Sequence, residues 1–70
     1  MELTPGMRDP SKNHYLLMPV KDLRNEIHAM ERTLYAVAGS VDPRLDTVYL
    51  DTSHRLRFAR AAMQIRDEVA

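Results

Sequence analysis

The sequence predicts an all-α protein: an antiparallel two-helix hairpin that follows an irregular N-terminal arm and assembles into a homo-oligomeric helical bundle. Three observations favour this fold. Apolar residues recur every three or four positions in two long segments, and the short connector between them contains residues that end and begin helices. The chain has 70 residues and no cysteine, and domains of this size usually need oligomerisation, a metal or disulfides to complete their core. We expect one domain over residues 1–70.

The arm is expected over residues 1–18. Pro5, Gly6 and Pro10 interrupt its first part. Because each proline fixes its own φ angle and lacks a backbone donor, we expect no regular element there. Two interpretations of the arm stay open at this point. It is either a disordered tail or a segment that lies on a neighbouring subunit.

A first helix is expected over residues 19–38. Pro19 fits its first turn, where the missing N–H costs nothing. The apolar positions then alternate in steps of three and four residues, which is the heptad pattern of a helix that packs against another helix. Gly39 follows directly and suits the left-handed conformation that often ends a helix. The apolar positions are Val20, Leu23, Ile27, Met30, Leu34 and Val37.

A second helix is expected over residues 42–69, with Asp42 as its cap and Pro43 in its first turn. It carries two apolar stripes, of which the first helix can cover only one. We therefore expect the second stripe to form the interface with another subunit. A break near Asp51 stays open, because β-favouring residues precede it. The first stripe is Leu45, Tyr49, Thr52, Leu56, Ala59 and Met63, and the second, the interface stripe, is Phe58, Ala62, Ile65 and Val69.

The charge and composition of the chain limit the kinds of molecule that it is expected to bind. Ten acidic and ten basic residues give no net charge, whereas a protein that binds duplex nucleic acid needs a basic excess. Eight of the ten bases are arginine, which suits planar contacts to phosphate or carboxylate. We expect a discrete anionic ligand and no duplex nucleic acid. The sequence has no apolar run that could span a membrane and no signal-peptide pattern, so we expect a cytoplasmic protein, in the host cytoplasm if it is viral.

The sequence contains no convincing set of catalytic residues. It has no cysteine nucleophile, no glycine-rich phosphate loop and no nucleophile elbow. The three histidines are not spaced as metal ligands or as members of a triad. We therefore expect a protein that is not an enzyme and that has no cofactor and no metal.

One face of the first helix is a candidate binding surface. Lys21, Asn25, His28 and Arg32 follow one another at steps of four, three and four residues, so they form a single stripe, which we call the donor stripe. Neither cation has an acidic residue three or four positions away. The stripe is either an ordinary solvated face or a surface for an anionic ligand. Tyr15, just before the helix, either stacks on a base or packs against the helix as a hydrophobic staple.

Short motifs between residues 15 and 66 match those of a known family. They are Tyr15, Asn25-Glu26-Ile27-His28-Ala29-Met30, Asp42-Pro43-Arg44, Thr52 and Phe58-Ala59-Arg60-Ala61. With these motifs the chain resembles the small phage sponges that bind cyclic-nucleotide messengers and thereby counter CBASS immunity. The resemblance implies helical hairpins that form compact homo-oligomers and bind cyclic di- or trinucleotides between subunits without hydrolysing them.

The resemblance also implies roles for individual residues. Tyr15 matches the stacking tyrosine, Asn25 the asparagine of the first-helix motif, and Thr52 the threonine of the second helix. The chain departs from the pattern at His28, where the family has a phosphate-binding lysine, and at Leu45, where it has tryptophan. Together with the donor stripe, the expected ligand-binding residues are Tyr15, Lys21, Asn25, His28, Arg32 and Thr52.

The resemblance thus implies a non-enzymatic phage sponge that sequesters a cyclic oligonucleotide and blocks host antiphage signalling. Two alternatives remain: a small viral protein that inhibits a host defence complex such as a CRISPR complex, and a helical assembly or adaptor module. The sponge requires the donor stripe and Tyr15 to converge across a subunit boundary. The inhibitor requires an exposed patch without a small-molecule pocket, and the adaptor requires neither.

Overall fold

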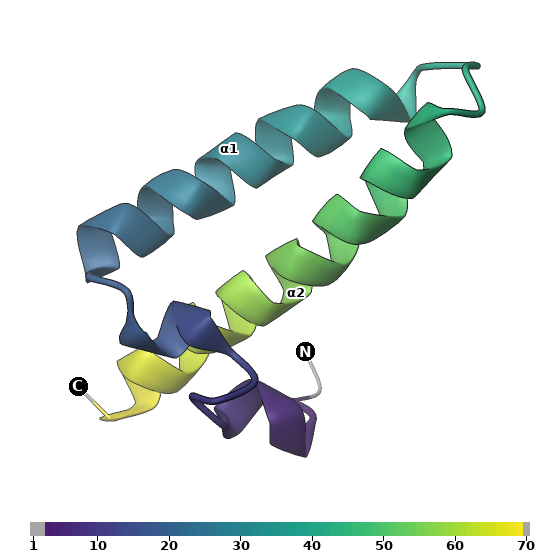
Figure 1. Cartoon of the computed structure of the whole chain (residues 1–70). Coiled ribbons are helices and arrows are strands. Elements are labelled where there is room, and N and C mark those ends of the chain that lie inside the picture. Colours follow the sequence, from purple (N-terminus) through teal and green to yellow (C-terminus); the bar gives the residue numbers. More distant parts are fainter. Residues whose placement is uncertain (1–2, 70) are drawn as a thin grey trace.

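The computed structural model of the chain describes residues 3–69, apart from the Val69 side chain, and contains four helical elements within that range. Two long antiparallel helices, α1 (Val20–Ala38) and α2 (Leu45–Val69), form a hairpin (Figure 1). Two short 3₁₀-helices, η1 (Pro5–Arg8) and η2 (His14–Leu17), precede it. The described residues contain no strand, so the all-helical hairpin is confirmed. Its assembly into a homo-oligomeric bundle stays a prediction.

Helix α1 matches the expected residues 19–38 to within one position. The backbone N–H of Leu23 donates to the Pro19 carbonyl over 2.9 Å and closes the first turn. Most of the predicted apolar seam points inward, since Leu23 and Met30 are buried and Ile27 and Leu34 pack against the same core. Val20, at the start of the seam, is exposed. The expectation for Gly39 was wrong. Its φ of −91° and ψ of 0° are not left-handed, because a tight turn of ordinary backbone ends the helix.

Helix α2 begins at Leu45, three residues later than expected. Asp42 caps a turn instead of the helix itself: its Oδ1 accepts from the Arg44 N–H over 2.9 Å, and its Oδ2 lies 2.8 Å from the Arg44 guanidinium. These hydrogen bonds hold the pKa of the Asp42 carboxyl below its usual value. The helix then continues through Asp51 without a break. A side chain one turn on, Arg55, pairs with Asp51 over 3.1 Å and supports that stretch.

The arm is not irregular, and it lies on its own chain's α2. Asn13, with only 1% of its surface exposed, attaches it: Nδ2 donates to the Met7 carbonyl (2.9 Å) and to the Phe58 carbonyl (3.1 Å), while Oδ1 accepts from the Tyr15 N–H (3.2 Å). Farther along α2, Arg66 donates to the Met18 carbonyl. Because these side chains satisfy the arm's backbone groups, the segment can fold in spite of its prolines.

The docked arm overturns the reason for assigning the second stripe of α2 to another subunit. Both η1 and η2 pack on α2, Ala62 is fully buried, and Phe58 and Ile65 are half-buried within one chain. The fourth residue of that stripe, Val69, has its side chain outside the described part. The stripe was expected to have no partner within the chain because the arm was expected either to be a disordered tail or to lie on a neighbouring subunit.

Candidate ligand-binding surfaces

The donor stripe lies on the outer side of α1, away from the apolar seam. Lys21, Asn25, His28 and Arg32 are all exposed. Three of them, Asn25, His28 and Arg32, line a shallow hollow of about 480 Å³. The structure therefore brings these three side chains together as expected, whereas Lys21 does not line the hollow.

The cations of the donor stripe have no ion pair with any described residue. Four arginines elsewhere are paired: Arg8 with Glu68, Arg44 with Asp42, Arg55 with Asp51, and Arg60 with Glu31. Lys21 and Arg32 are not among these pairs, so their N–H groups are free for an external acceptor. A stripe on one helix is nevertheless convex, and a ligand there would need a second wall from another molecule.

Tyr15 does not join the donor stripe. Its side chain is 5% exposed and belongs to the core, where its hydroxyl lies 3.9 Å from the Met30 sulfur. The His14 ring covers it, with the two ring centroids 4.1 Å apart. Burial raises the pKa of the Tyr15 hydroxyl, and the charge of nearby Arg55 lowers it by less. Thr52 is half-buried on α2. One chain alone therefore does not bring Tyr15 and Thr52 to the stripe.

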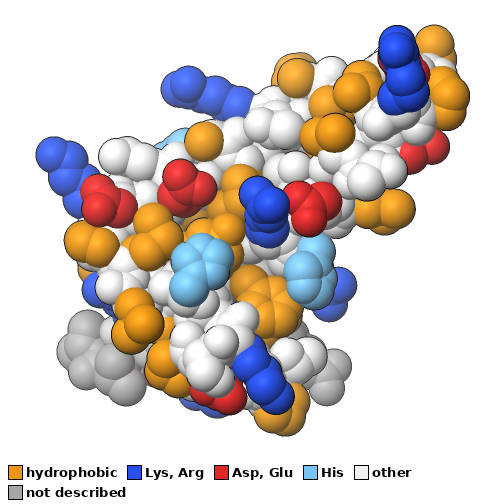
Figure 2. All heavy atoms as spheres, in the orientation of Figure 1, with side chains coloured by type: hydrophobic (Ala, Val, Ile, Leu, Met, Phe, Trp, Pro, Cys, Tyr) orange, Lys and Arg blue, Asp and Glu red, His pale blue; other side chains and the backbone are white. Residues whose placement is uncertain are grey.

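A second hollow, which we call the arm pocket, lies where the arm meets α2. It has a volume of about 220 Å³, and its apolar lining comes from Phe58 and from the almost fully buried Tyr15. Figure 2 shows this face of the molecule, with two histidines at the sides of an apolar patch. Four exposed nitrogen-bearing side chains also line the arm pocket, and we call them its rim: Lys12, His14, His54 and Arg55.

The composition of the arm pocket suits a flat ligand with negative charge. Lys12 and both histidines of the rim are exposed, and the His54 ring also lies 4.9 Å from the Phe58 ring. Arg55 contacts Asp51 through Nε, so its two terminal nitrogens are available. Donors with positive charge make the stronger hydrogen bonds to anions, and the exposed imidazole rings of His14 and His54 offer a surface for stacking.

Sequence reasoning missed the arm pocket because its two sides are about 40 residues apart in the chain and meet only when the arm docks. The available signal was Asn13, a residue that commonly caps helices, directly before the apolar run that contains Tyr15. That arrangement indicates an ordered short helix and not a tail.

The chain is similar to no protein-family model, no curated protein and no solved structure. Within residues 3–69, no helix combines the length and the apolar character needed to cross a bilayer. In the same range, no three His, Asp or Glu side chains are grouped closely enough to hold a metal ion.

Proposed function

We propose that this chain is a non-enzymatic binding protein for an anionic ligand with a flat ring, and specifically a sponge for a cyclic di- or trinucleotide messenger. The observation that carries the proposal is the arm pocket, which brings Lys12, Arg55 and two histidines together beside the Tyr15 and Phe58 side chains. The resemblance to phage sponges supplies the ligand class and, with it, a place of action in the cytoplasm of an infected host. The protein would act by withholding the messenger from the host's immune effector.

The size of the arm pocket limits how much of such a ligand it takes. Sites for drug-sized molecules have volumes of roughly 300–1,000 Å³, whereas this hollow has about 220 Å³. It therefore suits one base or one phosphate of a cyclic oligonucleotide, and the rest of the ligand needs another surface. The donor stripe of a second copy offers free cations for that part, consistent with a ligand bound between subunits.

Calorimetry with a panel of cyclic di- and trinucleotides tests the proposal. Arg55→Gln should weaken binding about tenfold or more, since a hydrogen bond to a charged group contributes roughly 1.5–3 kcal/mol. Arg32→Gln tests the donor stripe in the same way. Arg57→Gln is the matched control, because Arg57 is exposed on α2 and lines neither surface. If no member of the panel binds the unmodified protein, the sponge proposal is wrong.

A second candidate function is inhibition of a host protein complex through an apolar surface. The observation that favours it is the exposure of large apolar side chains near the hairpin turn, among them Tyr35 at 88% and Leu50 at 69%. This function predicts that Leu50→Asp abolishes activity against the host complex while nucleotide binding is absent or unchanged. The sponge predicts the opposite pattern, with activity lost in Arg55→Gln.

A further inference from the structure

A groove runs along one side of the hairpin, between α1 and α2. It consists of two hollows that meet at Arg60, whose guanidinium lies 3.3 Å from Glu31 and bridges the two helices. We call this side the groove face. Because both hollows share Arg60 and lie along the same helix pair, they form one continuous surface.

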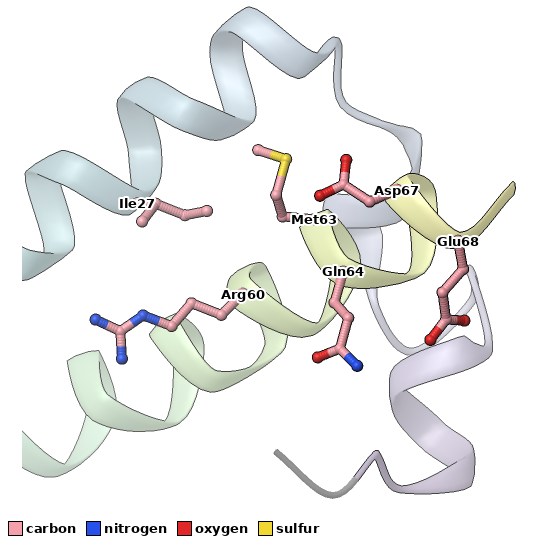
Figure 3. Close-up of a pocket in the computed structure, with 6 residues that line it drawn as sticks. All are labelled: Ile27, Arg60, Met63, Gln64, Asp67 and Glu68. Carbon is pink, nitrogen blue, oxygen red and sulfur yellow. The ribbon is translucent and has the colours of Figure 1, made fainter. Parts of the chain in front are cut away.

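The two ends of the groove face have different shapes. Near the hairpin turn, Tyr35 and Tyr49 flank a hollow of about 320 Å³, and the Tyr35 side chain is 88% exposed. At the other end, a hollow of about 510 Å³ has Ile27 and Met63 as its apolar walls (Figure 3). Gln64, Asp67 and Glu68 supply its polar rim. One end thus presents an aromatic ring and the other an open hollow.

From this arrangement we infer that the groove face binds a second copy of this chain in an antiparallel homodimer. An interface with two-fold symmetry uses the same patch on both copies, so the patch must complement itself. Glu31 lies midway between Tyr35 and Ile27, four residues from each. A two-fold axis across α1 at Glu31 therefore places the ring of Tyr35 over the hollow at Ile27 of the partner, and the reverse contact forms at the same time.

The chemistry of the two ends fits this contact. A tyrosine ring has a large apolar area and a hydroxyl that needs a partner when buried. The hollow offers Ile27 and Met63 to the ring, and the Gln64 amide and the Asp67 carboxylate to the hydroxyl. Sulfur in the side chain of methionine also makes favourable contacts with aromatic rings.

The long side of the molecule that contains the groove is large enough for a stable dimer. The molecule measures 41 × 24 × 20 Å, so one long face has an area close to the roughly 800 Å² that each partner buries in a standard interface. The resulting dimer is a four-helix bundle, in which α1 packs on α1 and α2 on α2 of the other copy. The arm reaches the edge of the groove face through the Arg8–Glu68 ion pair. The arm pocket shares no lining residue with the groove, so the inference does not depend on the proposed ligand.

Disulfide trapping tests the geometry, because the chain has no cysteine of its own. Glu31→Cys places a thiol next to the inferred axis and should form a cross-linked dimer on mild oxidation at micromolar concentration. Glu26→Cys is the matched control: it is exposed on the same helix but lines neither hollow of the groove. Equal cross-linking of the two variants would overturn the antiparallel arrangement.

Sedimentation equilibrium tests the contact itself. Tyr35→Arg should weaken dimerisation by roughly 30-fold or more, since buried tyrosines are among the residues that dominate interfaces. The fold should persist, because Tyr35 is almost fully exposed in the single chain, and circular dichroism checks this. Val41→Arg, at a side chain 99% exposed outside the groove, should leave the dimer intact. The inference would be overturned if the native chain is still monomeric at a concentration 100-fold above micromolar. Equal effects of the two variants would overturn it as well.

Discussion

The two ends of the hairpin are built from the same two helices but differ in what covers them. At the open end, the arm adds a third layer, and side chains such as Met7, Leu23 and Ala62 have almost no exposed surface. At the turn end, only α1 and α2 are present, and Val41 and Leu50 are largely exposed. Two helices can bury one stripe each against the other, so a third element is needed before a side chain is enclosed on every side.

The difference between the two ends indicates which end stabilises the single chain and which end contributes to association. The core cluster contains residues of η2, α1 and α2 together, from Tyr15 in the arm to Ala62 in the second half of α2. At the turn end, the first turns of α2 carry apolar residues on several sides, including Val48, Tyr49 and Leu50. A helix that is apolar on several sides is usually buried, so we expect the turn end to contribute more to association than to folding of the single chain.

The largest expected effect on stability comes from removing a core side chain at the open end. Leu23→Ala should lower the free energy of unfolding by ~2–5 kcal/mol, the usual range for removing a buried leucine side chain, because Leu23 is fully enclosed between the arm, α1 and α2. Leu50→Ala is the matched control at the turn end and should cost under about 1 kcal/mol as a surface change. Urea denaturation followed by circular dichroism measures both. Similar losses in the two variants would contradict the contrast between the ends.

A second substitution removes only the hydrogen bonds by which the Asn13 side chain attaches the arm to α2. Asn13→Ala leaves the carbonyls of Met7 and Phe58 without the amide that now donates to them, and a buried group without its partner costs about 1–3 kcal/mol. The open end should then resemble the turn end, with a loosened arm that proteases cleave faster. Asn25→Ala, at an exposed site on α1, is the control for losing an amide without losing an attachment. Unchanged proteolysis of the arm would show that other contacts hold it.

The sequence predicted α1 and α2 well because each depends on residues close together in the chain. The seam that contains Leu23 and Met30 follows from its spacing alone, and both residues are buried. The prediction for the arm was wrong because the structure of the arm depends on residues that are far apart in the chain. Its docking depends on Asn13 reaching Phe58, 45 residues away. The residues around Asn13 indicate a short helix, but they do not indicate its distant partner.

The same distinction, between residues close together and residues far apart in the chain, applies to the candidate site. The donor stripe could be predicted, since Asn25, His28 and Arg32 are neighbours on one helix. The arm pocket could not, since His14 and His54 meet only through the docked arm. For Tyr15 the sequence left stacking on a base and packing against the helix open, and the structure places the side chain in the core. A tyrosine before a helix suits both positions, and only the packing decides between them.

Alkaline pH offers a milder way to loosen the open end. The burial that raises the pKa of Tyr15 favours its neutral form, so the folded-state value lies above the unfolded one. That stabilisation is fully present below the unfolded value, near 10 for tyrosine, and is lost as pH rises through the folded value. Tyr15→Phe should change stability at neutral pH by less than about 1 kcal/mol, because the hydroxyl contacts only a sulfur, a weak acceptor.

The variant should also keep its helical signal to higher pH than the native chain. Circular dichroism between pH 8 and pH 12 measures this, with Tyr35→Phe as the control at an exposed ring. If Tyr15→Phe and the native chain lose structure at the same pH, ionisation of Tyr15 is not what opens this end of the molecule.

The smallest expected effect is a gain at the turn end. Gly39 ends α1 with a φ of −91°, a conformation that alanine adopts without strain, and no atom lies within 4 Å of a Cβ placed there. Gly39→Ala should therefore stabilise the protein by ~0.4–1 kcal/mol, chiefly because the unfolded chain loses conformational freedom. Thermal denaturation detects a change of this size in a 70-residue domain as a rise of a few degrees. The sequence alone favours the opposite sign, since a left-handed glycine at the end of a helix is destabilised by any added Cβ. A lower melting temperature of Gly39→Ala would thus support a left-handed conformation at Gly39. It would also show that the turn end is more tightly constrained than its exposed side chains indicate.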